Sequence, residues 1–319
     1  MKPAATGRKR RRIFLPIMVL ILLAALAWPI GLVMWISGKI PHVDALSGAP
    51  GTWGTTYLIT GSDKRSDDSP FQDDTEGERA DTIMLLHKRF WGTPALVSIP
   101  RDTWVNIPGY GENKINASYA LGGAPLLVET VEELTGLTVD HYVEVGMGSV
   151  SNMVDAVGGV ELCLDYDVSD PKSELEWEAG CHLADGPTAL AFSRMRYSDP
   201  RGDIGRTERQ RQVVKSTMNA ALTPSNALIP WNQVDLAQAG AAAVVTDPST
   251  GSWALGKMAL YLRSAMKAEL NGPPPIAETG YETSAGVAVL LDPERAPEFF
   301  GKLREGTLTK ADFTDNEPQ

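Results

Sequence analysis

Residues 141–164, HYVEVGMGSVSNMVDAVGGVELCL, give the clearest indication of the fold class. It begins and ends with short β-rich runs, at 141–145 and 160–164, which are typical of strands. Between these runs, residues 149–157 have the pattern of a helix, and Gly158 and Gly159 mark its end. A helix between two strands indicates an α/β domain that is built in layers.

The same alternation of strands and helices continues on both sides of this stretch. Further β-rich runs occur at 55–60, 82–87, 95–99 and 287–291, and helical patterns occur at 125–134, 206–222, 252–270 and 293–303. No long linker separates these segments, so residues 53–305 are expected to form one domain. The expected fold is a layered α-β-α domain with a central mixed sheet, followed by a flexible tail at 306–319.

The N-terminal part has the pattern of a membrane anchor. A basic segment, residues 1–12, precedes an apolar run at 13–36 that has no charged side chain. Roughly 24 residues at about 1.5 Å each can cross a bilayer core, so the run predicts one transmembrane helix. The basic flank predicts a cytoplasmic N-terminus and an extracytoplasmic domain in a single-pass cell-membrane protein, with a linker at 37–52. The alternative is a cleaved signal peptide with its cleavage site at 25–27.

Charge is distributed unevenly along the chain. Six of the 29 Lys and Arg residues lie within the first 12 residues, so the rest of the chain has 23 bases against 40 acids and a formal charge of −17. An acidic body of this kind repels nucleic acid phosphates, so no nucleic acid partner is expected. An anionic ligand would need a local basic pocket.

The two cysteines, Cys163 and Cys181, lie in the part of the chain that is expected outside the membrane, where oxidation is permitted. A disulfide between them would close a loop of roughly 20 residues and contribute about 3 kcal/mol in the chain-entropy model. The alternative is two separate buried thiols, because the sequence alone does not place the Cβ atoms within bonding range.

Arginines recur in four segments near the ends of β-rich runs. These segments are GSDKR at 61–65, ERADT at 78–82, SIPRDTWVNIPGYGENKINASYA at 98–120 and SRMRYSDPRGDIGRTERQRQ at 193–212. A strand at 189–196 would place Arg194 and Arg196 on one face, about 7 Å apart, a spacing that suits the two phosphates of a pyrophosphate. On the following helix, Arg206 and Gln210 share a face near the positive N-terminal end. The alternative is that these arginines only balance the acid excess in surface ion pairs.

Two aspartates beside the first strand pair, Asp63 and Asp81, are candidate metal ligands. Carboxylate oxygens near bound phosphates suit Mg²⁺ or Mn²⁺, which share their coordination with the substrate. The alternative is that Asp63 is an ordinary turn residue and that Asp81 caps the start of its strand.

In this order, the four arginine-bearing segments and VDAVGGVELCL resemble the LytR-CpsA-Psr family of bacterial cell envelopes. The resemblance, clear over residues 53–222, implies a deep apolar pocket for a polyprenyl chain. It also implies a transferase of phosphorus-containing groups that moves a glycopolymer from a polyprenyl-pyrophosphate carrier to peptidoglycan. The polymer would be a teichoic acid, a capsule or an arabinogalactan. One departure, GMGSV at 146–150, replaces the phenylalanine-containing stretch more usual in the family and affects the expected shape of the pocket.

The family pattern assigns roles to individual residues of this chain. It implies metal ligands at Asp63 and Asp81, and phosphate or substrate binders at Arg65, Arg79, Arg101, Lys114, Arg194, Arg196, Arg206 and Gln210. The residues expected to be catalytic are Arg101, Asp81, Asp203 and Arg206. The arginines would stabilise charge on the pyrophosphate, and Asp81 or Asp203 would accept the proton of the acceptor hydroxyl. Two other functions fit the same site, a polyprenyl-pyrophosphate phosphohydrolase and a non-enzymatic glycopolymer binder or regulator.

Overall fold

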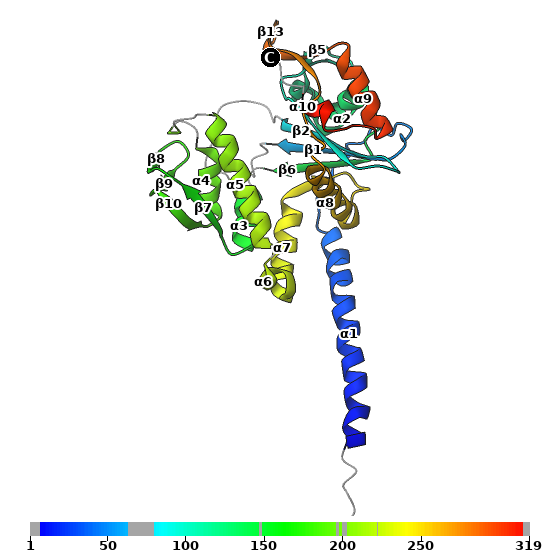
Figure 1. Cartoon of the computed structure of the whole chain (residues 1–319), viewed down its shortest axis with the longest axis vertical. Coiled ribbons are helices and arrows are strands. Elements are labelled where there is room, and N and C mark those ends of the chain that lie inside the picture. The colour runs from blue at the N-terminus through cyan, green and yellow to red at the C-terminus, as the bar shows by residue number, and fades with distance from the viewer. Residues whose placement is uncertain are drawn as a thin grey trace, which may run out of the picture.

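The computed structural model describes residues 7–62, 80–146, 149–195, 198–199, 203–221 and 223–314. A mixed sheet lies at the centre of the main body, with a second lobe on one side and the long helix α1 extending away from both (Figure 1). In spatial order, the central strands are β11 (Val244–Thr246), β6 (His141–Gly146), β1 (Thr55–Ser62), β2 (Ala80–Lys88), β3 (Ala95–Ile99) and β12 (Asn271–Gly272). Strand β1 is parallel to β6 and antiparallel to β2, and β3 is antiparallel to β2 and parallel to β12.

Helices cover both faces of the central sheet. Consecutive residues of a strand point to opposite faces, so they pack against different helices. Leu58 of β1 belongs to the same core as Leu127 of α2 (Ile115–Thr135) and Phe299 of α9 (Arg295–Glu305). Its neighbour Tyr57 packs instead in a core with Ala254 of α8 (Ser252–Lys267). The predicted α/β fold with a central mixed sheet is therefore confirmed.

Smaller elements complete the main body. They are the paired strands β4 (Trp104–Ile107) and β5 (Gly111–Lys114), the paired strands β13 (Ile276–Thr283) and β14 (Gly286–Leu291), and the short helix α10 (Ala311–Thr314). Leu308 and Phe313, in the segment for which a flexible tail is expected, pack against the core of α2 and α9.

The second lobe has a core of its own. It consists of α3 (Ser149–Ala156), β7 (Val160–Leu164), β8 (Val168–Asp170), β9 (Leu175–Trp177), β10 (Gly180–Ala184), α4 (Gly186–Arg194) and α5 (Asp203–Ala221). Leu162, Phe192 and Val213 are buried together in this core. Cys163 and Cys181, the predicted pair, are bonded as a disulfide and face each other across the antiparallel strands β7 and β10.

The strand predicted at 189–196 is wrong, because residues 189–194 lie in helix α4. Asp185 caps this helix, and its side chain accepts a hydrogen bond from the backbone N–H of Thr188 at 3.0 Å. Pro187 occupies the first turn, where its missing N–H costs nothing. Ala189 and Phe192, three residues apart, are both buried on the face that packs into the second core.

The helix predicted at 125–134 is part of a longer element. Helix α2 begins at Ile115, and it bends at Gly123, where a φ of 66° and a ψ of −158° interrupt the helical backbone. Pro125 then lies in the first turn after the bend, as its fixed φ favours. The predicted segment therefore corresponds to the second half of α2.

Helix α1 (Gly7–Ser37) contains 31 residues and extends beyond both lobes (Figure 1). Near its C-terminal end, Ile36 packs with Ile40 and with Ala241 of α7 (Pro230–Ala242), which follows the short helix α6 (Pro224–Leu228). Within the residues that the structure describes, no helix combines the length and the apolar character needed to cross a membrane.

Candidate active site

The ends of three strands and the start of a fourth meet at one edge of the central sheet. Strand β1 ends at Ser62, which pairs with Ala80 at the start of β2 and with Gly146 at the end of β6. Ile99, at the end of β3, pairs with Ile83 near the start of β2. This edge, called the site edge below, points toward the second lobe in Figure 1.

Candidates from the first two arginine-bearing segments adjoin the site edge along the chain. Asp63, Arg65 and Arg79 lie outside the described residues, between Ser62 and Ala80. The backbone of Asp81 lies in β2, where the pairing with β1 shifts between Gly61 and Ser62, and its side chain lies outside the description. The chain therefore leaves and re-enters the sheet at the site edge on either side of these candidates.

An apolar cavity of about 280 Å³ lies between the site edge and the second lobe. It is lined by Ile59, Thr60, Gly61, Thr82, Met84, Val145, Gly146, Val150, Leu190, Ser193, Gln210, Val213 and Val214. These described lining residues include no charged side chain, so the cavity suits a hydrocarbon chain. Gly146 and Val150 come from the stretch that departs from the family pattern, so that departure falls on the cavity wall.

Polar groups of α4 and α5 lie along the cavity. Gln210 is one of the lining residues, and the backbone of Arg206 lies four residues before it on α5, so both positions share one face of the helix. Asp203 is the first residue of α5. The side chains of Asp203 and Arg206 lie outside the described set, as does the whole of Arg196.

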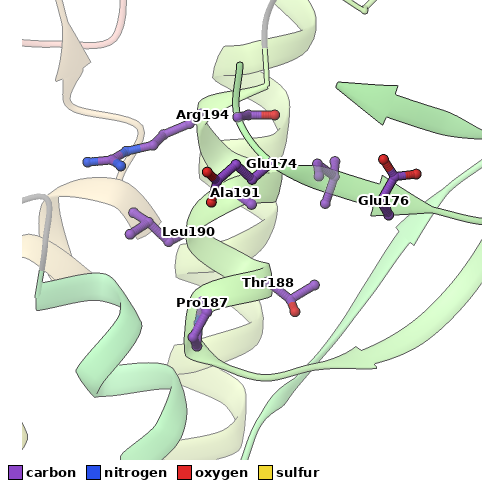
Figure 2. A pocket seen from close by; sticks show the side chains of 9 residues that line it. Glu174, Glu176, Pro187, Thr188, Leu190, Ala191 and Arg194 are labelled. Atoms are coloured by element: carbon purple, nitrogen blue, oxygen red, sulfur yellow. The ribbon is translucent and has the colours of Figure 1, made fainter. Parts of the chain in front are cut away.

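Arg194 lies next to the cavity on α4. It lines a neighbouring cleft of about 340 Å³, and Leu190 belongs both to this cleft and to the apolar cavity. Leu190 and Arg194 are four residues apart, and Figure 2 shows that they project from the same side of α4, away from Thr188 and Glu176. The guanidinium group of Arg194 is therefore one helical turn from the cavity wall.

Arg101 and Lys114 line a separate polar pocket of about 470 Å³. Asp102 lies between them, with its Oδ2 atom 3.5 Å from Arg101 Nε and its Oδ1 atom 3.2 Å from Lys114 Nζ. The backbone N–H of Asn116 donates to the carbonyl of Arg101 at 3.1 Å, which links the end of β3 to the start of α2. The structure thus brings Arg194 and Gln210 to the cavity, and Arg101 and Lys114 to a second pocket.

One arginine of the last basic segment is structural, which the sequence did not single out. The side chain of Arg209 is 4% exposed and forms an ion pair with Asp199. It also donates to the carbonyl oxygens of Phe192 and Met195, at the end of α4. The available signal was spacing, because Arg209, Val213 and Thr217 lie four residues apart and are all buried.

A buried carboxylate near the site edge was also missed. Glu144 of β6 is 3% exposed, and its Oε2 atom accepts hydrogen bonds from the hydroxyls of Tyr119 and Tyr142, both at 2.9 Å. The hydroxyl of Thr60 donates in turn to Tyr142 at 2.9 Å. Burial of the Tyr142 hydroxyl raises its pKa, and the negative charge of Glu144 raises it further. These contacts link α2 to β1 and β6 directly beneath the site edge.

The described residues contain no group of three or more His, Cys, Asp or Glu side chains that could hold a metal ion. The predicted ligands Asp63 and Asp81 are not fully described, but their donor chemistry fits, because Mg²⁺ binds through one or two carboxylates and completes its coordination with phosphate and water oxygens. The metal therefore stays a prediction that depends on these two residues.

Comparison with known proteins gives two kinds of similarity. The model of the LytR_cpsA_psr family matches residues 40–271. A protein of Corynebacterium glutamicum named "Probable cell wall biosynthesis protein LcpB" is 38% identical over 280 residues, covering 85% of this chain and 66% of that protein. A polyisoprenyl-teichoic acid–peptidoglycan teichoic acid transferase, TagU of Enterococcus faecalis, is 42% identical over 129 residues, covering 40% of this chain and 42% of TagU.

Among solved structures, the LytR-Csp2A-Psr enzyme from Actinomyces oris aligns with a TM-score of 0.56 at 21% identity, covering 83% of this chain and 95% of that one. This likeness supports the fold. The chain spans less than two thirds of the length of the curated relatives named above.

Proposed function

The chain belongs to the LytR-CpsA-Psr family, and from this premise we propose that it is a membrane-anchored phosphotransferase. It moves a glycopolymer from a polyprenyl-pyrophosphate carrier to peptidoglycan. The name of the relative TagU, a polyisoprenyl-teichoic acid–peptidoglycan teichoic acid transferase, supports the reaction class.

The observation that supports this proposal most strongly is the uncharged cavity beside basic and polar residues. Its aliphatic walls suit the prenyl chain of the donor, and Gln210 on α5 and Arg194 on α4 suit the adjacent phosphates. Arginine forks bind phosphate oxygens with two parallel hydrogen bonds. The site therefore suits both ends of an amphipathic donor. The apolar wall would contact its prenyl chain, and the guanidinium group would bind its phosphates.

In the proposed reaction, a hydroxyl oxygen of peptidoglycan attacks the phosphorus atom that is bonded to the sugar. The bond between this phosphorus and the bridging oxygen breaks, and polyprenyl phosphate leaves with the bonding electrons. Asp81 or Asp203 takes the hydroxyl proton. Arg101, Arg194 and Arg206 stabilise the charge of the phosphates, and positioning of this kind supplies most of the rate in phosphoryl transfer. A bound Mg²⁺ on Asp63 and Asp81 would neutralise further phosphate charge.

The proposed anchor is the run at 13–36, with the N-terminus in the cytoplasm. Helix α1 supports it, because it continues through this run without a break from Gly7 to Ser37. Its described side chains include the exposed Leu20, Ile30 and Met34, and exposed apolar surface of this kind marks a contact with a membrane or with another protein.

The test uses the full chain in detergent with a polyprenyl-pyrophosphate oligosaccharide, Mg²⁺ and peptidoglycan fragments, and measures sugar joined to peptidoglycan. We expect Arg206→Ala and Arg101→Ala each to lower turnover by about 100-fold or more, as loss of a charge-stabilising donor does. Arg263→Ala, at an exposed position on α8, is the matched control and should retain full activity.

Three results would contradict the proposal. Undiminished transfer by both site variants would reject this site. Release of phosphate that does not depend on peptidoglycan would identify a phosphohydrolase, and donor binding without turnover would identify a glycopolymer binder.

A further inference from the structure

The tip formed by α6 and the first turn of α7 exposes large apolar side chains. Leu228 is 75% exposed and Trp231 is 70% exposed, and only Ile229 and Pro230 separate them. From Ser216 to Thr246 the chain has a single charged residue, Asp235, although 22% of the whole chain is charged. This surface, residues 224–231, is called the α6–α7 tip below. It lacks the charges that keep the rest of the acidic body in water.

The α6–α7 tip is held beside α1. The indole Nε1 of Trp28 donates a hydrogen bond to Oε1 of Gln233 at 2.6 Å. Eight residues further along each helix, Ile36 of α1 packs with Ala241 of α7. Equal spacing on both helices means that α1 and α7 run in the same direction, side by side, as Figure 1 also shows. The start of α7 therefore lies near the level of Trp28, about 12 Å along the axis from Ile36.

We infer that the α6–α7 tip inserts into the outer leaflet of the lipid bilayer beside α1. The inference rests on the proposed anchor at 13–36, because Trp28 lies well inside the outer end of that run. A hydrocarbon core about 30 Å thick needs only about 20 residues of helix, so the level of Trp28 falls within the outer leaflet. A neighbouring element at the same level contacts lipid.

Side chains along both helices change with depth as this inference requires. Trp231 lies on the first turn of α7, and the exposed Asp235 lies one turn later, about 6 Å nearer the main body. The tip itself, residues 224–231, therefore has no charged residue, and the one charge in this part of the chain lies nearer the main body. Near the outer end of α1, the Nζ atom of Lys39 lies 5.0 Å from the ring centre of Trp35, a pair suited to the headgroup level.

The tip also connects the bilayer to the cavity. Val214, which lines the cavity, and Met218 lie four residues apart on α5 and are 54% and 61% exposed. Both lie on the same face of α5 as Gln210, at intervals of four residues toward the end of the helix at Ala221. The chain then passes to α6. An inserted tip would therefore place an apolar row between the membrane and the site of the prenyl chain.

The test measures the depth of single labelled positions in the full chain, reconstituted in vesicles of phosphatidylcholine and phosphatidylglycerol. Both native cysteines are in the disulfide, so an introduced cysteine is the free thiol available for a fluorescent label. The variants are Leu228→Cys in the tip, Leu20→Cys in α1 and, as control, Val287→Cys on β14, with exposed fractions of 75%, 69% and 57%. Each is quenched separately by doxyl-labelled lipid and by aqueous iodide.

We expect doxyl lipid to lower the fluorescence at Leu228→Cys and Leu20→Cys by about twofold, and iodide alone to quench Val287→Cys. Iodide quenching at Leu228→Cys with lipid quenching at Leu20→Cys would overturn the inference and leave the anchor intact. Iodide quenching at both would reject the anchor and the inference together. Shielding of Leu228→Cys from both quenchers would show that a protein surface, such as a second copy, covers the tip instead of lipid.

Discussion

His87 of β2 is buried with only one side of its ring hydrogen-bonded. Its relative exposure is 2%, and its Nδ1 atom lies 3.0 Å from the hydroxyl oxygen of Thr56. Its Nε2 atom has no hydrogen-bond partner among the described residues. Burial, together with the positive charges of Arg89 and Lys88, lowers the pKa of His87 from 6.5 to about 4. The native fold therefore holds this imidazole neutral.

This shift makes stability depend on pH. Between pH 6.5 and 4 the unfolded chain binds a proton at His87 that the native fold excludes, so stability is complete above pH 6.5 and falls as the pH drops toward 4. The total loss is about 3 kcal/mol, from about 1.4 kcal/mol for each pH unit. We expect His87→Gln to flatten this part of the stability curve, measured by urea unfolding of the full chain in detergent. An unchanged slope in the variant would contradict the assignment.

At the scale of elements, the strands that carry the site edge could be predicted from the sequence. The β-rich runs at 55–60, 82–87, 95–99 and 141–145 all lie within observed strands of the central sheet, because β-branched and large apolar side chains fit a buried sheet. The junction of these strand ends therefore follows largely from the sequence.

The segment of helix α4 was predicted to be a strand because its apolar residues, 189–192, form one short continuous run, which fits a strand or a helix. Asp185 and Pro187, at the cap and in the first turn, are signals of a helix start that did not enter the prediction, and the single spacing of Arg194 and Arg196 was interpreted as that of a strand. The role of Arg209 was also missed. Its spacing with Val213 and Thr217 was the one signal in the sequence, but which of the six arginines is buried depends on how α4 and α5 pack.

The contacts of Arg209 fix the end of α4 against α5 and thereby position Arg194. We expect Arg209→Leu to lower the free energy of unfolding by about 3–5 kcal/mol, because it leaves Asp199 as a buried charge without this partner. Turnover should fall as well, since Arg209 also binds the carbonyls of Phe192 and Met195 next to Arg194. Urea unfolding and transfer assays on the same preparation measure both effects.

A double-mutant cycle separates this ion pair from general damage to the helix. Adding Asp199→Asn to Arg209→Leu removes the buried charge, so the double variant should be more stable than the sum of the two single changes by about 1–3 kcal/mol. Strict additivity of the two substitutions would show that the pair does not position α4.

At the scale of the whole molecule, the apolar cavity lies where two separate cores meet. Ile59 and Met84 come from the central sheet, and Val213 comes from the core of the second lobe. A ligand in the cavity contacts both lobes at once, so its binding free energy stabilises their arrangement as well as each lobe.

This arrangement predicts that polyprenyl phosphate, the proposed leaving group, stabilises the full chain. At about 100 times its Kd, the lipid should raise the free energy of unfolding by about 2.7 kcal/mol. Val214→Asp places a charge on the cavity wall at a half-exposed position, so it should fold and lose this stabilisation. Urea unfolding in detergent, with and without the lipid, measures the difference.

Val287→Asp provides the matched control, because Val287 is 57% exposed on β14 and is not among the cavity-lining residues. It introduces the same charge and should keep the stabilisation by lipid. If both variants were stabilised like the parent chain, the lipid would bind elsewhere on the molecule. If neither variant were stabilised, the added charge would be acting at long range through the acidic body. In that case a salt concentration of about 1 M, at which the Debye length is about 3 Å, would restore lipid binding in both variants. Loss in Val214→Asp alone, at low and high salt, assigns the lipid to the junction of the two cores.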